Sequence, residues 1–262
     1  MIVSLRNLTS LAATGLVAAI LAGPATAATI TQWNFNTNAP GTNNSPLPST
    51  GAGTAVMVGM TGNNPNGDFP SATGSSDPAA PNLGWRVRGN TSNGWSGTTS
   101  LFSGAQFNAS TTGYTNIGVT MDVFATDGSP RYAQLQLTTD GSNFTSFGPL
   151  LDFNASNDNW ANGISYDFSA VAGASNNPNF GFKLVSAFSP VEFTDAGGLH
   201  AANSAFQRAD ADPAGNAYNG TAGNYRFDMV TISGTVVPEP STCVLIVCGF
   251  GLFVAAQRRR NA

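Results

Sequence analysis

The chain has 262 residues and a net charge of −4, and only 9% of its residues are charged, against about 25% in an average soluble protein. Gly, Ser, Thr and Asn replace the missing charges, while aromatic residues make up 10% of the chain, so a folded protein with a neutral, polar surface is expected rather than a disordered one. Residues 28–236 hold 6 Lys and Arg against 13 Asp and Glu, which excludes a basic surface for nucleic acid.

Residues 1–27 have the pattern of a secretory signal peptide. Arg6 supplies the positive start, residues 11–22 are apolar, and Ala25 and Ala27 form the small-residue cleavage site. A buried N-terminal helix is the alternative, but it leaves the Gly-Pro pair before this site unexplained. We therefore predict a signal helix recognised by the Sec export machinery, followed by an exported domain over 28–236.

The exported domain shows the two-residue period of β-strands. Apolar and polar residues alternate over 117–123 and again over 132–137. Further strands are predicted over 30–35, 84–88, 164–168, 180–185 and 225–233. Because no helical periodicity is long enough for a βαβ crossover, we predict an all-β fold, an antiparallel β-sandwich of the jelly-roll kind.

Two strand pairings follow from the sequence. The turn residues Asp127-Gly128-Ser129-Pro130 stand between two alternating runs and predict a hairpin of 117–123 with 132–137. We also expect the first and last strands, 29–36 and 225–234, to be neighbours. Residues 37–82 and 195–224 are long and loop-like, and such loops are either functional or poorly ordered.

Candidate catalytic and metal-binding residues are few. The one histidine, His200, has no cysteine or second histidine near it in sequence, so we expect a solvated loop residue. The domain holds a single glutamate, Glu192, and most of its aspartates stand in turn sequences. Asp210 and Asp212 are candidate calcium ligands, with ordinary solvated aspartates as the alternative. We predict no enzyme, no cofactor and no catalytic residue.

Three tryptophans, Trp85, Trp95 and Trp160, leave two interpretations open. Exposed and coplanar, they would form a stacking platform for sugar rings. Buried, they would belong to the core, which is the more frequent place for tryptophan in a β-protein.

The C-terminal residues 237–262 have three parts in a fixed order. Val237-Pro238-Glu239-Pro240-Ser241 predicts an extended, accessible linker, because its prolines stiffen the backbone and lack an N–H group. The apolar run 243–256 predicts a short membrane helix, and Arg258, Arg259 and Arg260 would stop it and keep this end cytoplasmic.

This tail closely resembles that of the bacterial PEP-CTERM sorting family, and the strand and turn pattern of the domain is similar to the jelly-roll ectodomains often attached to such tails. The resemblance implies a membrane-embedded exosortase as partner, which would recognise Pro238, Glu239 and Pro240 and cleave near them. It implies export to the cell envelope or beyond, with at least transient anchoring in the inner membrane by the C-terminal helix.

Three functions remain open from the sequence. The first is a non-enzymatic, structural or adhesive surface or matrix protein sorted through its tail. The second is a carbohydrate-binding module that takes polysaccharide as a partner. The third is a secreted hydrolase, which two carboxylates converging with His200 in one cleft would favour.

Overall fold

The computed structural model describes residues 26–38, 43–60, 66–88, 95, 99–153, 158–209, 223–237 and 257. The signal-peptide residues before Thr26 lie outside this part, as does almost all of the sorting tail after Val237. Within the described residues, no helix is both long and apolar enough to cross a membrane. The predicted signal helix and membrane helix both fall on residues that are not described.

Within the described residues of the domain all regular structure is β, as predicted. The fourteen strands are β1 (Ala27–Trp33), β2 (Thr54–Val58), β3 (Asn66–Asp68), β4 (Trp85–Arg88), β5 (Gly104–Asn108), β6 (Tyr114–Ala125), β7 (Tyr132–Thr138), β8 (Thr145–Ser146), β9 (Leu151–Asp152), β10 (Trp160–Asp167), β11 (Gly181–Ala187), β12 (Phe193–Asp195), β13 (Gly198–His200) and β14 (Tyr225–Val236).

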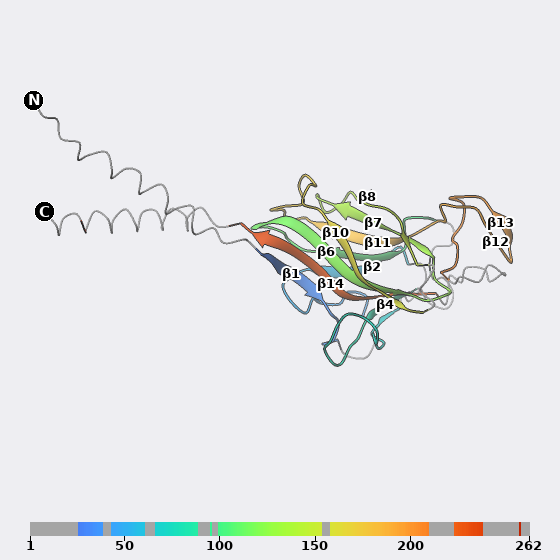
Figure 1. Ribbon diagram of the computed structural model, residues 1–262, viewed down its shortest axis with the longest axis horizontal. Coiled ribbons are helices and arrows are strands. Elements are labelled where there is room, and N and C mark those ends of the chain that lie inside the picture. Colours follow the sequence, from blue (N-terminus) through green and yellow to red (C-terminus); the bar gives the residue numbers. More distant parts are fainter. Residues whose placement is uncertain are drawn as a thin grey trace, which may run out of the picture.

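Two six-stranded sheets form the body of the protein (Figure 1). In sheet A the order is β10-β6-β14-β4-β3, and β1 also pairs with β14. In sheet B the order is β2-β5-β11-β7-β8, and β9 also pairs with β7. Every pairing between these strands is antiparallel, and β12 and β13 form a separate hairpin.

Aromatic side chains from both sheets fill the space between them. Phe107 of sheet B has its ring centroid 5.7 Å from that of Phe227 and 6.0 Å from that of Trp85, both in sheet A. Phe182, beside Phe107 in sheet B, and Trp33 of sheet A add stacked and edge contacts at 5.3 and 5.2 Å. The sheets therefore pack face to face as a sandwich, with no disulfide to support them.

The expected pairing of the first and last strands is confirmed. Strand β1 runs antiparallel to β14, with Trp33 opposite Val230 and Ala27 opposite Thr235. At the end of β14, the backbone N–H of Val237 donates to the carbonyl oxygen of Gly113 over 2.8 Å. The first strand thus starts at the predicted signal cleavage site, and the last strand ends at the start of the predicted sorting motif.

The predicted hairpin of 117–123 with 132–137 is wrong. These runs are β6 and β7, which lie in different sheets. Strand β6 already has β10 and β14 as neighbours, and β7 has β11 with β8 and β9, so neither has a free edge for the other. The turn after Ala125 carries the chain across the sandwich, and its Ser129 carbonyl accepts a hydrogen bond from the N–H of Ala209 over 2.9 Å.

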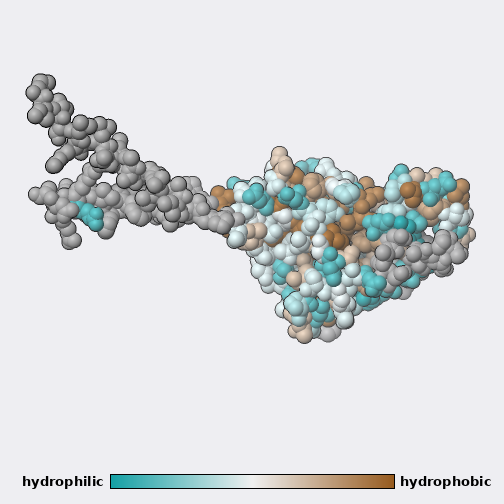
Figure 2. Space-filling model, in the orientation of Figure 1, coloured by the Kyte–Doolittle hydropathy of each residue, from teal (hydrophilic) through white to brown (hydrophobic). Residues whose placement is uncertain are grey.

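The two segments expected to be loops contain strands. Residues 37–82 hold β2 and β3, at the edges of sheets B and A, and residues 195–224 include β13. The face shown in Figure 2 is mostly pale or teal, with brown residues in separate patches, in keeping with a surface of small polar residues.

Candidate functional site

The tryptophans do not form the exposed platform that the sequence left open. Trp85 is 0% exposed and Trp95 is 3% exposed, and both belong to the core between the sheets. The indole N–H of Trp85 donates to the Asn43 carbonyl oxygen over 2.9 Å. Trp160 is half-buried on sheet A. The core interpretation therefore holds for two of the three residues, and no coplanar surface results.

We expected His200 to be a solvated loop residue. It lies instead in the β12–β13 hairpin. Its Nε2 atom lies 2.8 Å from Oδ1 of Asp195, and its ring stacks on Phe193 with centroids 4.8 Å apart. Burial raises the pKa of Asp195, but hydrogen bonds from His200 and from the N–H of Gly197 outweigh this effect, so the pKa is lowered. This arrangement closes the hairpin, and among the described residues His200 forms an ion pair with Asp195 alone.

Two carboxylates do converge, but on sheet A and out of reach of solvent. Asp122 of β6 lies directly opposite Asp228 of β14, and they are 1% and 0% exposed. Asp122 accepts hydrogen bonds from the backbone N–H groups of Ser76 and Gly163, and Asp228 accepts from the hydroxyl of Ser75. The segment that contains Ser75 and Ser76 covers the pair, so the two carboxylates hold this segment and do not form an open site.

The outer face of sheet B carries a row of five side chains, four of them polar, that crosses five strands. The register places one outward side chain of each strand in line, and we call this set the amide row: Val56, Gln106, Lys183, Gln136 and Ser146. At a strand spacing of about 4.8 Å the row is about 19 Å long. It suits an extended ligand that lies across the strands.

Gln136 is the central feature of this row. It is only 7% exposed, yet its side-chain amide forms no hydrogen bond with any described residue. The neighbouring Gln134 differs, because its amide nitrogen donates to the carbonyl oxygens of Leu135 and Phe147, both over 2.9 Å. The described buried side-chain atoms without a partner belong to Trp33, Tyr166 and Ser186, so the Gln136 amide still reaches solvent. Gln136 therefore has two donors and an acceptor available to a ligand or to water.

Lys183 stands beside Gln136 in the row and is the only lysine of the chain. It forms no ion pair with any described carboxylate, and its ammonium lies 4.5 Å from the ring centroid of Phe144. Burial lowers the pKa of Lys183. Phe144 follows a turn fixed by Asp140, whose carboxylate accepts from the N–H groups of Asn143 and Ser142 over 2.7 and 2.8 Å.

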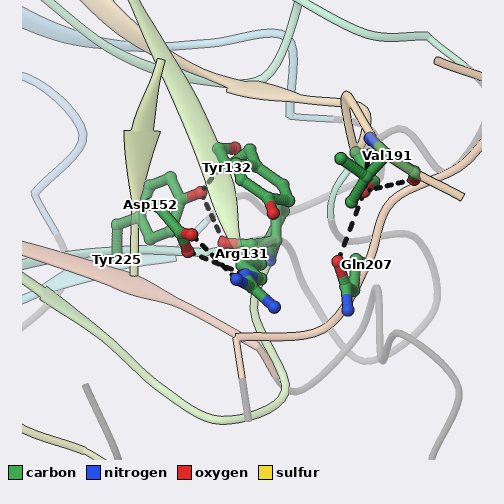
Figure 3. A network of polar contacts seen from close by, with 8 residues as sticks. Arg131, Tyr132, Asp152, Val191, Gln207 and Tyr225 are labelled. Carbon is green, nitrogen blue, oxygen red and sulfur yellow. Dashed lines mark hydrogen bonds and ion pairs between the residues drawn. The ribbon is translucent and has the colours of Figure 1, made fainter. Parts of the chain in front are cut away.

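A polar network at one end of β7 fixes the start of this strand (Figure 3). The guanidinium of Arg131 donates to both carboxylate oxygens of Asp152 in β9, over 2.7 and 2.8 Å, and lies over the ring of Tyr132. From inside the sandwich, the hydroxyl of Tyr225 donates to the Pro130 carbonyl oxygen over 2.7 Å. These contacts tie β9 and β14 to β7 and so hold its outward face, which includes Gln136, in register.

Two residues of the predicted cleavage site and sorting motif, Ala27 and Val237, are described, and they lie at the same end of the body. Ala27 is exposed and lies opposite Thr235, and Val237 is 41% exposed. The remaining predicted residues lie outside the described part: Ala25, Pro238, Glu239, Pro240, Ser241, Arg258, Arg259, Arg260, Asp210 and Asp212. Within the described residues, no group of three or more metal-binding side chains is found.

Neither a family model nor a curated protein matches the sequence. Among solved structures, the chain is similar to the CBM22-1 xylan-binding domain of Paenibacillus barcinonensis, with 10% identity over 70% of this chain and 87% of that domain and a TM-score of 0.34. It is also similar to the N-terminal cellulose-binding domain of a Cellulomonas fimi β-1,4-glucanase, with 13% identity over 70% and 90% and a TM-score of 0.29. These low scores establish neither a shared topology nor a shared ligand.

Proposed function

We propose that this chain is an exported, non-enzymatic surface or matrix protein that binds polysaccharide through the amide row of sheet B. The observation that carries the proposal is the unpartnered amide of Gln136 beside Lys183. An amide both donates and accepts, and an ammonium donates three times, which suits the hydroxyl groups of a sugar polymer. A partly exposed aromatic ring, here Phe144, adds an apolar surface for a sugar ring.

The low charge content of the chain favours the same ligand class. A chain with 9% charged residues has few ion pairs to offer a protein partner, and hydroxyl-rich ligands are bound mainly by uncharged donors and acceptors supported by aromatic rings. The length of the row, about 19 Å, matches an extended polymer better than a small metabolite.

Binding is tested with a single substitution and a matched control. Gln136→Leu removes the amide but keeps an apolar stem, and Gln32→Leu makes the same change on sheet A, where Gln32 donates to Thr231. Affinity electrophoresis through gels containing soluble xylan, β-glucan or mannan measures binding. We expect Gln136→Leu to lose retardation while Gln32→Leu keeps it.

Stability separates a binding effect from misfolding. Because the amide of Gln136 has no partner among the described residues and reaches solvent, its replacement by Leu should leave the free energy of unfolding nearly unchanged. If both variants are retarded like the wild-type protein, or if no polysaccharide retards any of them, the amide row is not a glycan site.

Export and sorting form the second part of the proposal. In it the chain carries a signal helix over 1–27, a jelly-roll-like ectodomain, and a PEP-CTERM tail in which Pro238, Glu239 and Pro240 are recognised by an exosortase at the inner membrane. The register of β1 and β14 supports this arrangement, because Ala27 and Thr235 are opposite each other. Both processing events would then occur at the same end of the folded body.

The sorting proposal is tested on cells that express the wild-type chain or Glu239→Ala. Fractionation and the mass of the mature C-terminus are measured for each. We expect the wild-type protein to lose the residues after the motif and the variant to retain them in the membrane fraction. If both keep residues 243–262 and localise alike, the sorting proposal fails while the glycan proposal stands.

A further inference from the structure

The outer face of sheet A carries a second row, which differs in chemistry from the amide row. The register aligns one outward side chain from each of five strands, and we call this set the arginine row: Trp160, Phe124, Arg226, Arg86 and Asp68. Arg88, two residues along β4 from Arg86, lies on the same face. Three of the six cationic residues between 28 and 236 are therefore gathered on this face.

The three arginines of this face have one described carboxylate, Asp68, as an ion-pair partner between them. Asp68 is occupied by Arg86, which donates to it from two nitrogens, and one nitrogen of Arg88 lies 3.9 Å away. Arg226 lies directly opposite Arg86 on the adjoining strand and forms no ion pair with any described carboxylate. Like charges directly opposite each other in a sheet are destabilising.

The surroundings of Arg226 add to this cost. Burial first, and then the charges of Arg86 and Arg88, lower the pKa of Arg226, whereas Asp158 and Asp68 raise it without pairing with it. Its guanidinium lies 4.5 Å from the ring centroid of Phe124, which holds it in place, and Asn224 accepts from its Nε over 3.4 Å. The guanidinium is thus partly desolvated and positioned, and it lacks an anion.

Two features of the face indicate what would supply that anion. The guanidinium groups of Arg86 and Arg88 remain reachable, with side-chain exposures of 22% and 32%. Arginine binds carboxylates through two parallel hydrogen bonds. Next to Arg226, the rings of Phe124 and Trp160 meet edge to face at 5.6 Å, and Trp160 is only half-buried. An aromatic surface beside an arginine suits a ligand with both a sugar ring and a carboxylate.

We propose that the arginine row is a binding site for an acidic polysaccharide, in which Arg226 holds a uronate carboxylate and the adjoining aromatic pair contacts the sugar ring. The site is on the opposite face of the sandwich from the amide row and does not depend on it. Residues 28–236 carry 13 Asp and Glu against 6 Lys and Arg, which opposes long-range attraction of any polyanion, so the proposed binding rests on the local contacts of the row.

The test compares Arg226→Gln with Arg208→Gln in the full chain. Both changes remove one positive charge, but Arg208 pairs with Asp127, which lies in the turn between β6 and β7. Binding to polygalacturonate, to neutral dextran and to double-stranded DNA is measured by biolayer interferometry at low and high salt. We expect Arg226→Gln to weaken polygalacturonate binding about tenfold or more and Arg208→Gln to change it by less than about twofold.

Other outcomes would overturn the proposal. Equal losses in the two variants would mean that only net charge matters, and DNA binding that matches polygalacturonate would mean a general anion surface. Absence of polygalacturonate binding by the wild-type chain would also refute it. Arg226→Gln relieves the like-charge contact with Arg86 but loses the contact with Phe124, so the melting temperature of each variant is measured to establish that it is folded. Gln136→Leu, which tests the other face, should leave polygalacturonate binding unchanged.

Discussion

Asp228, buried opposite Asp122, makes the stability of the protein depend on pH in an unusual direction. Burial raises the pKa of Asp228 from 3.8 to about 7, against the hydrogen bonds from Ser75 and Met229 that favour the ionised form. The folded state therefore holds this proton more tightly than the unfolded chain does. Between about pH 4 and pH 7 unfolding releases a proton, so the free energy of unfolding falls as the pH rises.

The size of the effect follows from the shift. A difference of about three pKa units, at about 1.36 kcal/mol each, corresponds to about 4 kcal/mol between pH 4 and pH 8. Asp228→Asn keeps the shape of the side chain, and its amide can accept from the N–H of Met229 and donate to the hydroxyl of Ser75. The variant should equal the wild-type protein near pH 4 and exceed it by up to about 4 kcal/mol at pH 8.

Urea unfolding followed by tryptophan fluorescence at pH 4, 5, 6, 7 and 8 measures this difference. Asp122→Asn is the control, because Asp122 accepts from two backbone N–H groups over 2.6 and 2.8 Å and an amide N–H₂ would face one of these donors. It should lose about 1.5–3 kcal/mol. A stability difference between Asp228→Asn and the wild-type protein that does not grow from pH 4 to pH 8 would refute the reasoning.

Three further changes test the packing of the sandwich. Phe107→Ala should cost about 3–5 kcal/mol in urea unfolding, because this ring contacts aromatic rings of both sheets; a loss under about 1 kcal/mol would mean that the core collapses around the gap. Tyr225→Phe leaves the carbonyl of Pro130 without its 2.7 Å partner. The free energy of unfolding should fall by about 1–3 kcal/mol in thermal unfolding, and a smaller loss would show that water replaces the hydroxyl. Arg131→Lys should cost less than about 1 kcal/mol at low salt, because its partner Asp152 is 43% exposed, and a larger loss would show that the two-nitrogen contact is structural.

The alternating strands could be predicted from the sequence because burial follows the same alternation. In β14, Tyr225 and Phe227 face the core, and in β4 the pair Trp85 and Val87 does so. Among the strands that were not predicted, β5 has small residues at Gly104 and Ala105 where larger ones would have made the period visible. The burial of Trp85 could have been predicted, because Trp85 shares a face of β4 with Val87, whereas Arg86 points the other way.

Strand partners and both polar rows could not be predicted, because each depends on register across the sheets. The turn at Asp127 and Gly128 indicates that the chain reverses, but not which sheet the next strand joins. Gln136 and Lys183 are 47 positions apart in the sequence and become neighbours only when β7 pairs with β11. A single lysine on the polar face of a predicted strand was the one available signal for the amide row.

The placement of β14 also has a mechanical consequence. This strand of 12 residues is hydrogen-bonded to β6 along one side and to β4 and β1 along the other, and the chain leaves it at Val237. A pull on that end acts along the strand axis, so the ladder bonds on both flanks are sheared together and are not unzipped one after another. A tether attached there would load the strongest direction of the sheet, and the body would resist extension before it unravelled.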